Sequence, residues 1–475
     1  MATELLHRAY DPGAFREQGH ALIDRLADYL ETVSDRPANP YATPGESLET
    51  FRALLAAGAG PEEVFARVID HSVHLHHPDY MGHQVVPPAP LAALSDLTAS
   101  LLNTGMAIFE MGRAGTAIER VVTERFAELL ELAPTAGGFL TSGGSLANLT
   151  ALLAARARYG PAERPCLLVN EHAHYCIERA VHVMGWGPEG IIHVPADDEL
   201  RMRTALIDGL VADARAAGRT PVAIVGSACT TATGSYDPIA ALADAAERHG
   251  LWLHVDGAHG AAVRLDPRRR HLVAGLERAD SFALDFHKML MSPAITTGLF
   301  FRQGADAYRT FRQRADYLLA AEPGPDDWSD IARRSFECTK RMLGLRVYTL
   351  LSAYGPQVFV DYVQRAVDLG TTLAQLVREC PDLELFMTPD VNIVCFRFVH
   401  PALDTDGRNG VNGMIRAGIV EAHGPYIVQT TLDGAVWLRC TLTNPFTTRE
   451  HLAAMLGQVT RRGRQLVDLR AAIGK

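Results

Sequence analysis

Two residues of complementary chemistry stand at the ends of predicted strands. Asp256 lies in His254-Val-Asp-Gly-Ala-His-Gly260, and Lys288 closes Ser281-Phe-Ala-Leu-Asp-Phe-His-Lys288. A lysine amine can form a Schiff base with an aldehyde, and a carboxylate can keep a pyridine nitrogen protonated. Pyridoxal 5'-phosphate (PLP) chemistry needs both groups from the protein, so the pair indicates a PLP enzyme in which Lys288 and Asp256 are catalytic residues.

A glycine-rich turn ahead of a predicted helix offers a place for the cofactor phosphate. In Thr141-Ser-Gly-Gly-Ser145, Gly144 lets the backbone approach an anion, and Ser145 is well placed to cap the helix. The free amides and the dipole of a helix N-terminus attract phosphate. Taken alone, the same motif also fits a capped turn that binds nothing.

Three further positions could surround a cofactor ring. His174, just past a predicted strand, could lie flat on the ring and donate a proton, although an unplaced histidine is more often a core residue. Ala258, two residues after Asp256, is small enough for the opposite ring face. Thr230 or Thr231, in a Ser/Thr-rich loop after another strand, could bond Asp256 or the cofactor, or could simply form a turn.

A histidine-rich segment precedes these motifs. Four histidines fall within residues 71–77, and His83 follows the Pro-Asp turn. Histidines at this density could chelate a metal, but no nearby carboxylate pair or cysteine completes a recognisable ligand spacing. We therefore expect no metal site here, and we expect His83 or Gln84 to line the substrate pocket.

The elements that must position these residues follow an alternating pattern. Short β-rich runs alternate with Ala/Leu-rich helices, and the strands are predicted at 166–170, 191–194, 222–226, 251–256, 281–285 and 298–301. Near-continuous apolar strands joined by helices predict a mostly parallel central sheet with helices on both faces. The fold class is therefore α/β.

The chain divides into three predicted parts. Residues 1–85 form an N-terminal helical dimerisation segment, with amphipathic helices at 14–34 and 47–57 too small for a core of their own. Residues 86–365 form the large PLP-binding domain. Residues 366–475 form a small C-terminal α+β domain, which follows one long helix or a broken pair at 343–378.

Composition restricts the partners and the compartment. The 475 residues carry a formal net charge of −10, which leaves no basic face for nucleic acid. The start lacks a secretory signal and no apolar run reaches bilayer-spanning length, so we expect a cytoplasmic protein without a membrane partner. The seven cysteines show no disulfide or metal spacing, which favours reduced, buried thiols.

Together the motifs resemble those of the group II PLP-dependent amino acid decarboxylases, the family of the aromatic amino acid, glutamate, histidine and 2,4-diaminobutyrate decarboxylases. The matching stretches occur in family order along nearly the whole chain: His77-Pro-Asp-Tyr-Met-Gly-His83, Thr141-Ser-Gly-Gly-Ser-Leu-Ala-Asn-Leu149, His172-Ala-His-Tyr175, Thr230-Thr-Ala-Thr-Gly-Ser-Tyr-Asp-Pro238, His254-Val-Asp-Gly-Ala-His-Gly260, Asp285-Phe-His-Lys288 and Leu438-Arg-Cys-Thr-Leu-Thr-Asn-Pro445. Around His83 the sequence resembles bacterial diamino or other small amino acid decarboxylases more than the aromatic group.

The resemblance implies an aspartate-aminotransferase-type fold (fold type I) and a homodimer with active sites at the interface. It also implies that an L-amino acid is decarboxylated to the corresponding amine and CO2 through an external aldimine and a quinonoid. Lys288 would form the internal aldimine, Asp256 would bind the pyridine nitrogen, and His174 would stack on the ring. The rest of the cofactor site would comprise Gly144, Ser145, Thr231, Ala258, Asp285 and His287, and residues 103–109 would reach the neighbouring pocket.

One feature departs from the family pattern. Family decarboxylases carry a tyrosine on a mobile loop that returns a proton to Cα, whereas the corresponding residues 320–334 contain Trp328 and no tyrosine. An indole cannot deliver that proton at neutral pH, and we expect Trp328 to line the substrate pocket. Three alternatives stay open: His174 or Tyr317 supplies the proton, oxygen intercepts the reaction and yields an aldehyde, or the protein binds PLP without turnover.

Overall fold

The computed structural model describes residues 2–311 and 327–473, and the chain divides into two compact units. The first unit comprises Met1–His83, Thr372–Phe386 and Cys395–Lys475, and the second comprises Gln84–Thr371 and Met387–Val394. The predicted three-part division, with boundaries near residues 85 and 365, stays a prediction.

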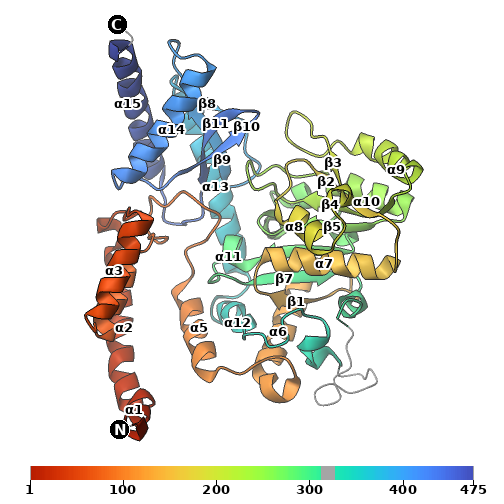
Figure 1. Ribbon diagram of the computed structural model, residues 1–475, viewed down its shortest axis with the longest axis horizontal. Helices are drawn as coiled ribbons and strands as arrows, with labels where there is room; N and C mark the ends of the chain where they lie inside the picture. Colours follow the sequence, from red (N-terminus) through yellow and green to blue (C-terminus); the bar gives the residue numbers. More distant parts are fainter. Residues whose placement is uncertain (1, 312–326, 474–475) are drawn as a thin grey trace. The chain divides into compact units, whose positions relative to one another are not determined.

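A seven-stranded sheet forms the centre of the second unit (Figure 1). Its strand order is β1-β7-β6-β5-β4-β2-β3, and the four pairings that join β3, β2, β4, β5 and β6 are parallel, while β7 runs antiparallel to both of its neighbours. The bounds are β1 Gly137–Thr141, β2 Pro165–Asn170, β3 Ile191–Val194, β4 Thr220–Ser227, β5 Trp252–Asp256, β6 Ser281–Asp285 and β7 Thr297–Phe301. The predicted α/β fold with a mostly parallel sheet is confirmed.

Side chains alternate between two cores on the two faces of this sheet. Along β6, Phe282 and Leu284 pack into one core while Ala283 packs into the other, as the two-residue period of a strand requires. The helices of this unit are α5 Pro90–Leu102, α6 Phe109–Leu129, α7 Gly144–Tyr159, α8 Cys176–Val183, α9 Ile207–Ala216, α10 Ile239–His249, α11 Phe286–Met289 and α12 Gly344–Tyr354. Residues of α7 and α8 contribute to one core, and residues of α6, α9, α10 and α12 contribute to the other.

The predicted helical segment 343–378 is a broken pair. Helix α12 ends at Tyr354, and its C-cap is Gly355, whose positive φ of +70° glycine tolerates; Pro356 follows. Helix α13 then runs over Gln357–Glu379. The break therefore has a local cause that is visible in the Gly-Pro dipeptide.

The first unit begins with α1 Ala2–Ala9, α2 Pro12–Thr32, α3 Pro44–Ala56 and α4 Pro61–Asp70. Helix α3 starts with a capping box in which Thr43 and Glu46 bind each other's backbone amides. Later in the chain, β8 Leu383–Leu385, β9 Ile393–Phe398, β10 Val428–Leu432 and β11 Ala435–Thr441 form an antiparallel sheet, accompanied by α14 Thr405–Glu421 and α15 Arg449–Ile473. Within the described ranges, no helix is long and apolar enough to cross a bilayer.

Candidate active site

A cavity of about 270 Å³ opens where the loops that follow the strands of the large sheet meet. Strands β2, β4, β5 and β6 are parallel, so their carboxyl ends lie at one edge, where open α/β sheets bind ligands. The lining residues are Ser142, Gly143, Gly144, Ser145, Asn148, His174, Cys176, Cys229, Thr231, Asp256, Ala258, His259, Asp285, His287, Lys288 and Ile295. The structure thus brings all nine predicted cofactor residues to one cavity.

Lys288 projects into this cavity from α11, the short helix after β6. Its Nζ lies 3.1 Å from Asp285 Oδ2, and its side chain retains 22% exposure. Burial lowers the pKa of Lys288, but the carboxylates of Asp285 and Asp256 oppose that effect and raise the pKa above its ordinary value overall. The amine is therefore held as an ammonium ion that must lose a proton before it can attack an aldehyde.

Asp256 is the last residue of β5 and is buried. Its Oδ1 accepts a hydrogen bond from the backbone N–H of Ala258 at 3.2 Å, and its Oδ2 lies 3.8 Å from the Sγ of Cys176. Both oxygens thus have a donor on the protein side, while the residue lines the cavity. An acceptor-only carboxylate placed in this way can bind a protonated ring nitrogen.

His174 stands at the same wall, just before α8. The backbone N–H of Cys176 donates to His174 Nδ1 at 3.3 Å, so the neutral ring carries its proton on Nε2. Burial lowers the pKa of His174, and the Asp256 charge only partly opposes this shift. A neutral imidazole is suited both to stacking on a ring and to donating a proton.

The glycine-rich turn approaches the cavity more closely than a side chain would allow. A Cβ on Gly144 would lie 3.2 Å from Asp285 Oδ2 and 3.3 Å from the Cβ of Ala258. Gly143, whose φ is +107°, is the N-cap of α7, so the prediction that Ser145 caps the helix is wrong. The left-handed backbone at Gly143 ends the turn early, which makes Gly144 and Ser145 the first helical residues.

The site's chemistry fits PLP. The N-terminus of a 16-residue helix suits a phosphate, a lysine amine suits an aldehyde, and a buried carboxylate suits a pyridinium nitrogen. The space next to Gly144 is a cradle that a single methyl group would narrow. His287 is fixed beside it, because the backbone N–H of Thr296 donates to His287 Nδ1 at 3.2 Å.

His174, Cys176 and Asp256 also form a group whose donor atoms lie within 4.8 Å of one another, which is close enough for a metal ion. Burial, with a smaller contribution from Asp256, raises the pKa of the Cys176 thiol to about 12. Zinc binds cysteine as the thiolate, so a thiol that keeps its proton disfavours metal binding here. The same three atoms are better suited to line an organic ring.

The predicted substrate-pocket residues lie in different places. Gln84 and Trp328 are not among the lining residues of the cavity in the described parts of the chain, and His83 belongs to the first unit. Gln84 is nevertheless near: two residues later, the Val86 N–H donates to the carbonyl of His287 at 3.1 Å. All three assignments stay predictions.

Trp328 packs beside α6. Its ring meets that of Phe109 edge-on, with the centroids 6.4 Å apart, and the guanidinium of Arg120 lies 5.8 Å from its ring centroid. Tyr317 and residues 320–326 of the predicted catalytic loop lie outside the described residues.

Seven lining residues were not predicted: Ser142, Gly143, Asn148, Cys176, Cys229, His259 and Ile295. Asn148 lies one helical turn after Gly144, inside a recognised motif but without an assigned role. Cys176 lies two residues after His174, just past the motif that ends at Tyr175. The cysteines were expected to be buried, and Cys338 is an exposed exception. Spacing relative to assigned residues was the signal that could have identified Asn148.

Comparison with known proteins agrees with this geometry. Residues 61–399 match the family profile of the pyridoxal-dependent decarboxylase conserved domain. The chain is 30% identical to the L-2,4-diaminobutyrate decarboxylase of Rhizobium meliloti (strain 1021), over 95% of this chain and 92% of that protein. It is 25% identical to the aromatic-L-amino-acid decarboxylase of Bacillus atrophaeus, over 94% of each.

Among solved structures, Oryza sativa TDC with PLP and tryptamine superposes with a TM-score of 0.88 at 22% identity, over 96% of this chain and 99% of that chain. This likeness confirms the predicted fold type I architecture. The family profile covers most of the chain, and the relatives named above are amino acid decarboxylases. The chain therefore belongs to the pyridoxal-dependent decarboxylase family and is a PLP-dependent carboxy-lyase that acts on an amino acid.

Proposed function

We propose that this enzyme converts an L-amino acid to the corresponding amine and CO2, with Lys288 as the covalent anchor of PLP, Asp256 as the partner of the ring nitrogen and His174 as the stacking residue. The observation that carries this assignment is the convergence of the three side chains on one cavity, opposite the N-terminus of α7. We propose Gly144, Ser145, Thr231, Ala258, Asp285 and His287, the other lining residues that the sequence predicted, as further cofactor contacts.

PLP supplies an electron sink for the bonding electrons released as CO2 departs. Asp256 would hold the proton on the ring nitrogen through one carboxylate oxygen, and its Oδ1 accepts a hydrogen bond from the Ala258 N–H. Lys288, whose ammonium form is favoured by Asp285 at 3.1 Å, would have to lose a proton before its amine bonds the cofactor aldehyde. The Nε2–H of neutral His174 is a candidate donor to Cα, which would relieve the need for a loop tyrosine.

The N-terminal segment supports the proposal of a homodimer. Helices α1 and α2 expose large apolar side chains, among them Leu5 at 64%, Leu6 at 61% and Phe15 at 51% exposure. Exposed apolar faces of this kind mark interaction sites. For the substrate, we propose that 2,4-diaminobutyrate be tested first, because the 30% identical relative is a decarboxylase of that amino acid.

The test uses the small number of lysines. The sequence contains only Lys288, Lys340 and Lys475, so borohydride reduction of the holoenzyme followed by peptide mass mapping has three possible targets. We expect the phosphopyridoxyl tag on Lys288 alone. Lys288→Ala should lose the tag and the visible absorbance, while the control Lys475→Ala should keep both. A tag on Lys340, or no tag, would overturn the assignment.

The reaction type is tested by incubating the holoenzyme with 2,4-diaminobutyrate and the common amino acids. We expect CO2 and amine in equal amounts, without peroxide or aldehyde. Peroxide formed in step with CO2 would establish the oxygen-dependent route instead. If the protein shows the visible absorbance of bound PLP but releases no CO2 from any of these amino acids, it binds PLP without turnover.

A further inference from the structure

Six polar side chains form a continuous hydrogen-bonded chain inside the second unit, from the cavity wall to the start of β5. Trp252 Nε1 lies 2.9 Å from Ser281 Oγ, which lies 2.9 Å from His254 Nδ1. His254 Nε2 lies 2.9 Å from Asn148 Oδ1, and Asn148 Nδ2 lies 3.2 Å from Cys176 Sγ. The Sγ then lies 3.8 Å from Asp256 Oδ2.

The backbone explains why these groups meet. Trp252, His254 and Asp256 occupy alternate positions of β5, so their side chains leave the same face of the sheet. Asn148 reaches them from α7, and Cys176 is the first residue of α8. Each member of the chain is at least nine-tenths buried. Water therefore cannot readily replace any of these hydrogen bonds.

The two ends fix the direction of the hydrogen bonds. An indole N–H can only donate, and an ionised carboxylate can only accept. With Trp252 donating to Ser281 and Asp256 accepting from Cys176, every bond between them points toward the carboxylate. The Asn148 amide then donates to sulfur through Nδ2 and accepts from His254 through Oδ1, which uses both of its ends.

His254 must be neutral and protonated on Nε2 for this arrangement to hold. Burial lowers the pKa of His254 to about 4, despite the opposing Asp256 charge, so the ring is neutral at pH 7. Its Nδ1 also lies 3.2 Å from the Ser281 carbonyl, which would bind the other tautomer. With the proton on Nδ1, His254 Nε2 would accept, so the Asn148 amide would have to flip and present Oδ1 to the Cys176 thiol. The thiol would then donate to Asn148 and not to Asp256 Oδ2, so the buried carboxylate favours the Nε2–H tautomer.

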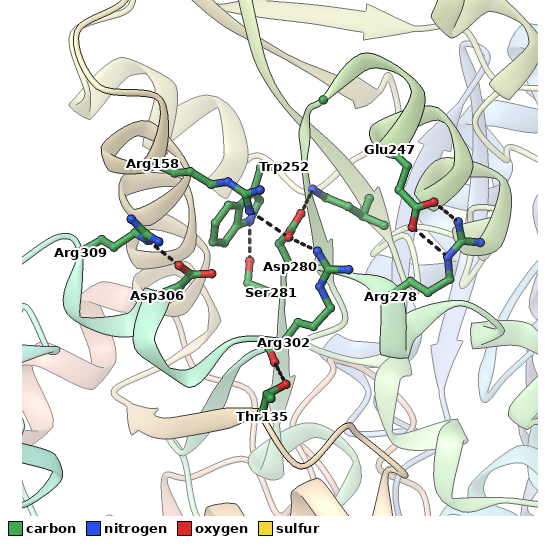
Figure 2. Close-up of polar contacts among 12 residues, drawn as sticks. Thr135, Arg158, Glu247, Trp252, Arg278, Asp280, Ser281, Arg302, Asp306 and Arg309 are labelled. Carbon is green, nitrogen blue, oxygen red and sulfur yellow. Dashed lines mark hydrogen bonds and ion pairs between the residues drawn. The ribbon is translucent and has the colours of Figure 1, made fainter. Parts of the chain in front are cut away.

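The far end of the chain is held by an ionic cluster (Figure 2). Asp280 accepts from Arg302 at 2.7 Å, from Arg158 at 3.3 Å and from the Leu253 backbone N–H at 2.9 Å. The Arg158 guanidinium also lies 5.6 Å from the ring centroid of Trp252. The indole that begins the hydrogen-bonded chain is therefore held at its N–H by Ser281 and at its ring by Arg158.

We propose that Asn148 and Cys176 are positioning residues, which orient the Asp256 carboxylate toward the cofactor nitrogen through the buried hydrogen-bonded chain. This inference rests on the proposed role of Asp256. Cys176 bonds Asp256 Oδ2, and Asn148 orients the Cys176 sulfur. Loss of either side chain should therefore weaken cofactor binding and shift the visible spectrum of the bound cofactor. Neither substitution removes a group that itself bonds the reacting atoms.

The test compares Asn148→Leu and Cys176→Ala with the control Cys166→Ala, which removes an equally buried thiol from β2. We expect each of the first two variants to weaken PLP binding by about tenfold, the loss typical of a hydrogen bond to a charged group. We also expect a changed pH dependence of the visible absorbance. Cys166→Ala should bind PLP as the parent does, and Cys176→Ser, which keeps a donor, should recover most of the affinity.

The decisive measurement repeats the substitutions in an Asp256→Asn background, where the carboxylate is already lost. In that background Asn148→Leu and Cys176→Ala should have no further effect on the affinity for PLP or on its visible spectrum. Effects that persist there, or well-folded single variants that bind PLP as the parent does, would overturn the positioning role. If Asp256→Asn alone keeps the parent spectrum and turnover, the proposed role of Asp256 fails first. If Cys176→Ala does not fold, the Cys176→Ser and Asn148→Leu pair decides.

Discussion

Replacement of Lys340 by methionine tests a buried ion pair that closes the edge of the large sheet. Strand β1 lies at the end of the strand order, and among the described residues β7 is its one partner strand. Where a further strand would lie, Lys340 Nζ binds both Glu119 Oε1 and the Leu140 carbonyl at 2.6 Å, and the Leu140 N–H donates to the same Glu119 oxygen at 3.1 Å. The two charged side chains thus take the place of a neighbouring strand.

The environment of the pair sets the size of the effect. The Lys340 side chain is 0% exposed and that of Glu119 is 1% exposed. Burial lowers the pKa of Lys340, and the Glu119 charge opposes that shift. Lys340→Met would leave a carboxylate buried without its counter-ion and a carbonyl without its donor. Loss of one partner of such a pair lowers the free energy of unfolding by about 3–5 kcal/mol.

The assay is urea unfolding of the apoprotein, followed by far-UV circular dichroism. The double variant Glu119→Met/Lys340→Met removes the stranded charge, so we expect it to be more stable than Lys340→Met alone. The Leu140 carbonyl lacks its donor in both variants, whereas the Leu140 N–H keeps Glu119 as its acceptor in the single variant and loses it only in the double variant. A single variant within about 1 kcal/mol of the parent, or a double variant less stable than the single one, would refute the reasoning.

Three further predictions concern the active site and its supporting network. Gly144→Ala should weaken PLP binding with little change in the melting temperature, because the new Cβ lies 3.2 Å from Asp285 Oδ2; equilibrium titration of the apoenzyme measures this. Asp256→Asn should lower kcat by about 100-fold or more while unfolding changes little, as steady-state assays and melting curves will reveal. The folded-state pKa of His254, about 4, lies below its unfolded value of 6.5, so the unfolded chain binds more protons and stability falls as pH drops through this window. Between pH 7 and pH 5 the contribution is about 2 kcal/mol, and His254→Gln should reduce this pH dependence of the urea midpoint.

The sequence was sufficient to predict the parallel sheet and the residues at the carboxyl ends of its strands. Asp256 is the last residue of β5 and Asp285 is the last residue of β6. The carboxyl ends of parallel strands lie at the same edge of the sheet, so both side chains were expected there. The register of β5 against β4 places Asp256 opposite Ser227, so loops distant in sequence meet at the cavity. For these residues the local pattern determines the location.

The roles of Asn148 and Cys176 show which parts of the site could not be predicted. Both lie on helices and both look like ordinary buried residues in the sequence, since an asparagine inside a helix and a scattered cysteine have many uses. Their role depends on how α7 and α8 are rotated against β5, which the packing of both cores determines. The hydrogen-bonded chain forms only when six residues from separate parts of the sequence come together, so no single sequence motif predicts it.

The arrangement also gives a physical reason for building an electron-sink site in this way. In the role proposed for Asp256 a carboxylate acts where it is buried, and a buried carboxylate is stabilised by donors rather than by solvent. A neutral chain ending in a thiol supplies a donor without adding a positive charge that would compete with the pyridinium for the carboxylate. The thiol of Cys176, whose pKa burial raises to about 12, keeps its proton at neutral pH and remains that donor. An arginine at the same position would hold the carboxylate more strongly, yet would weaken its attraction for the ring nitrogen.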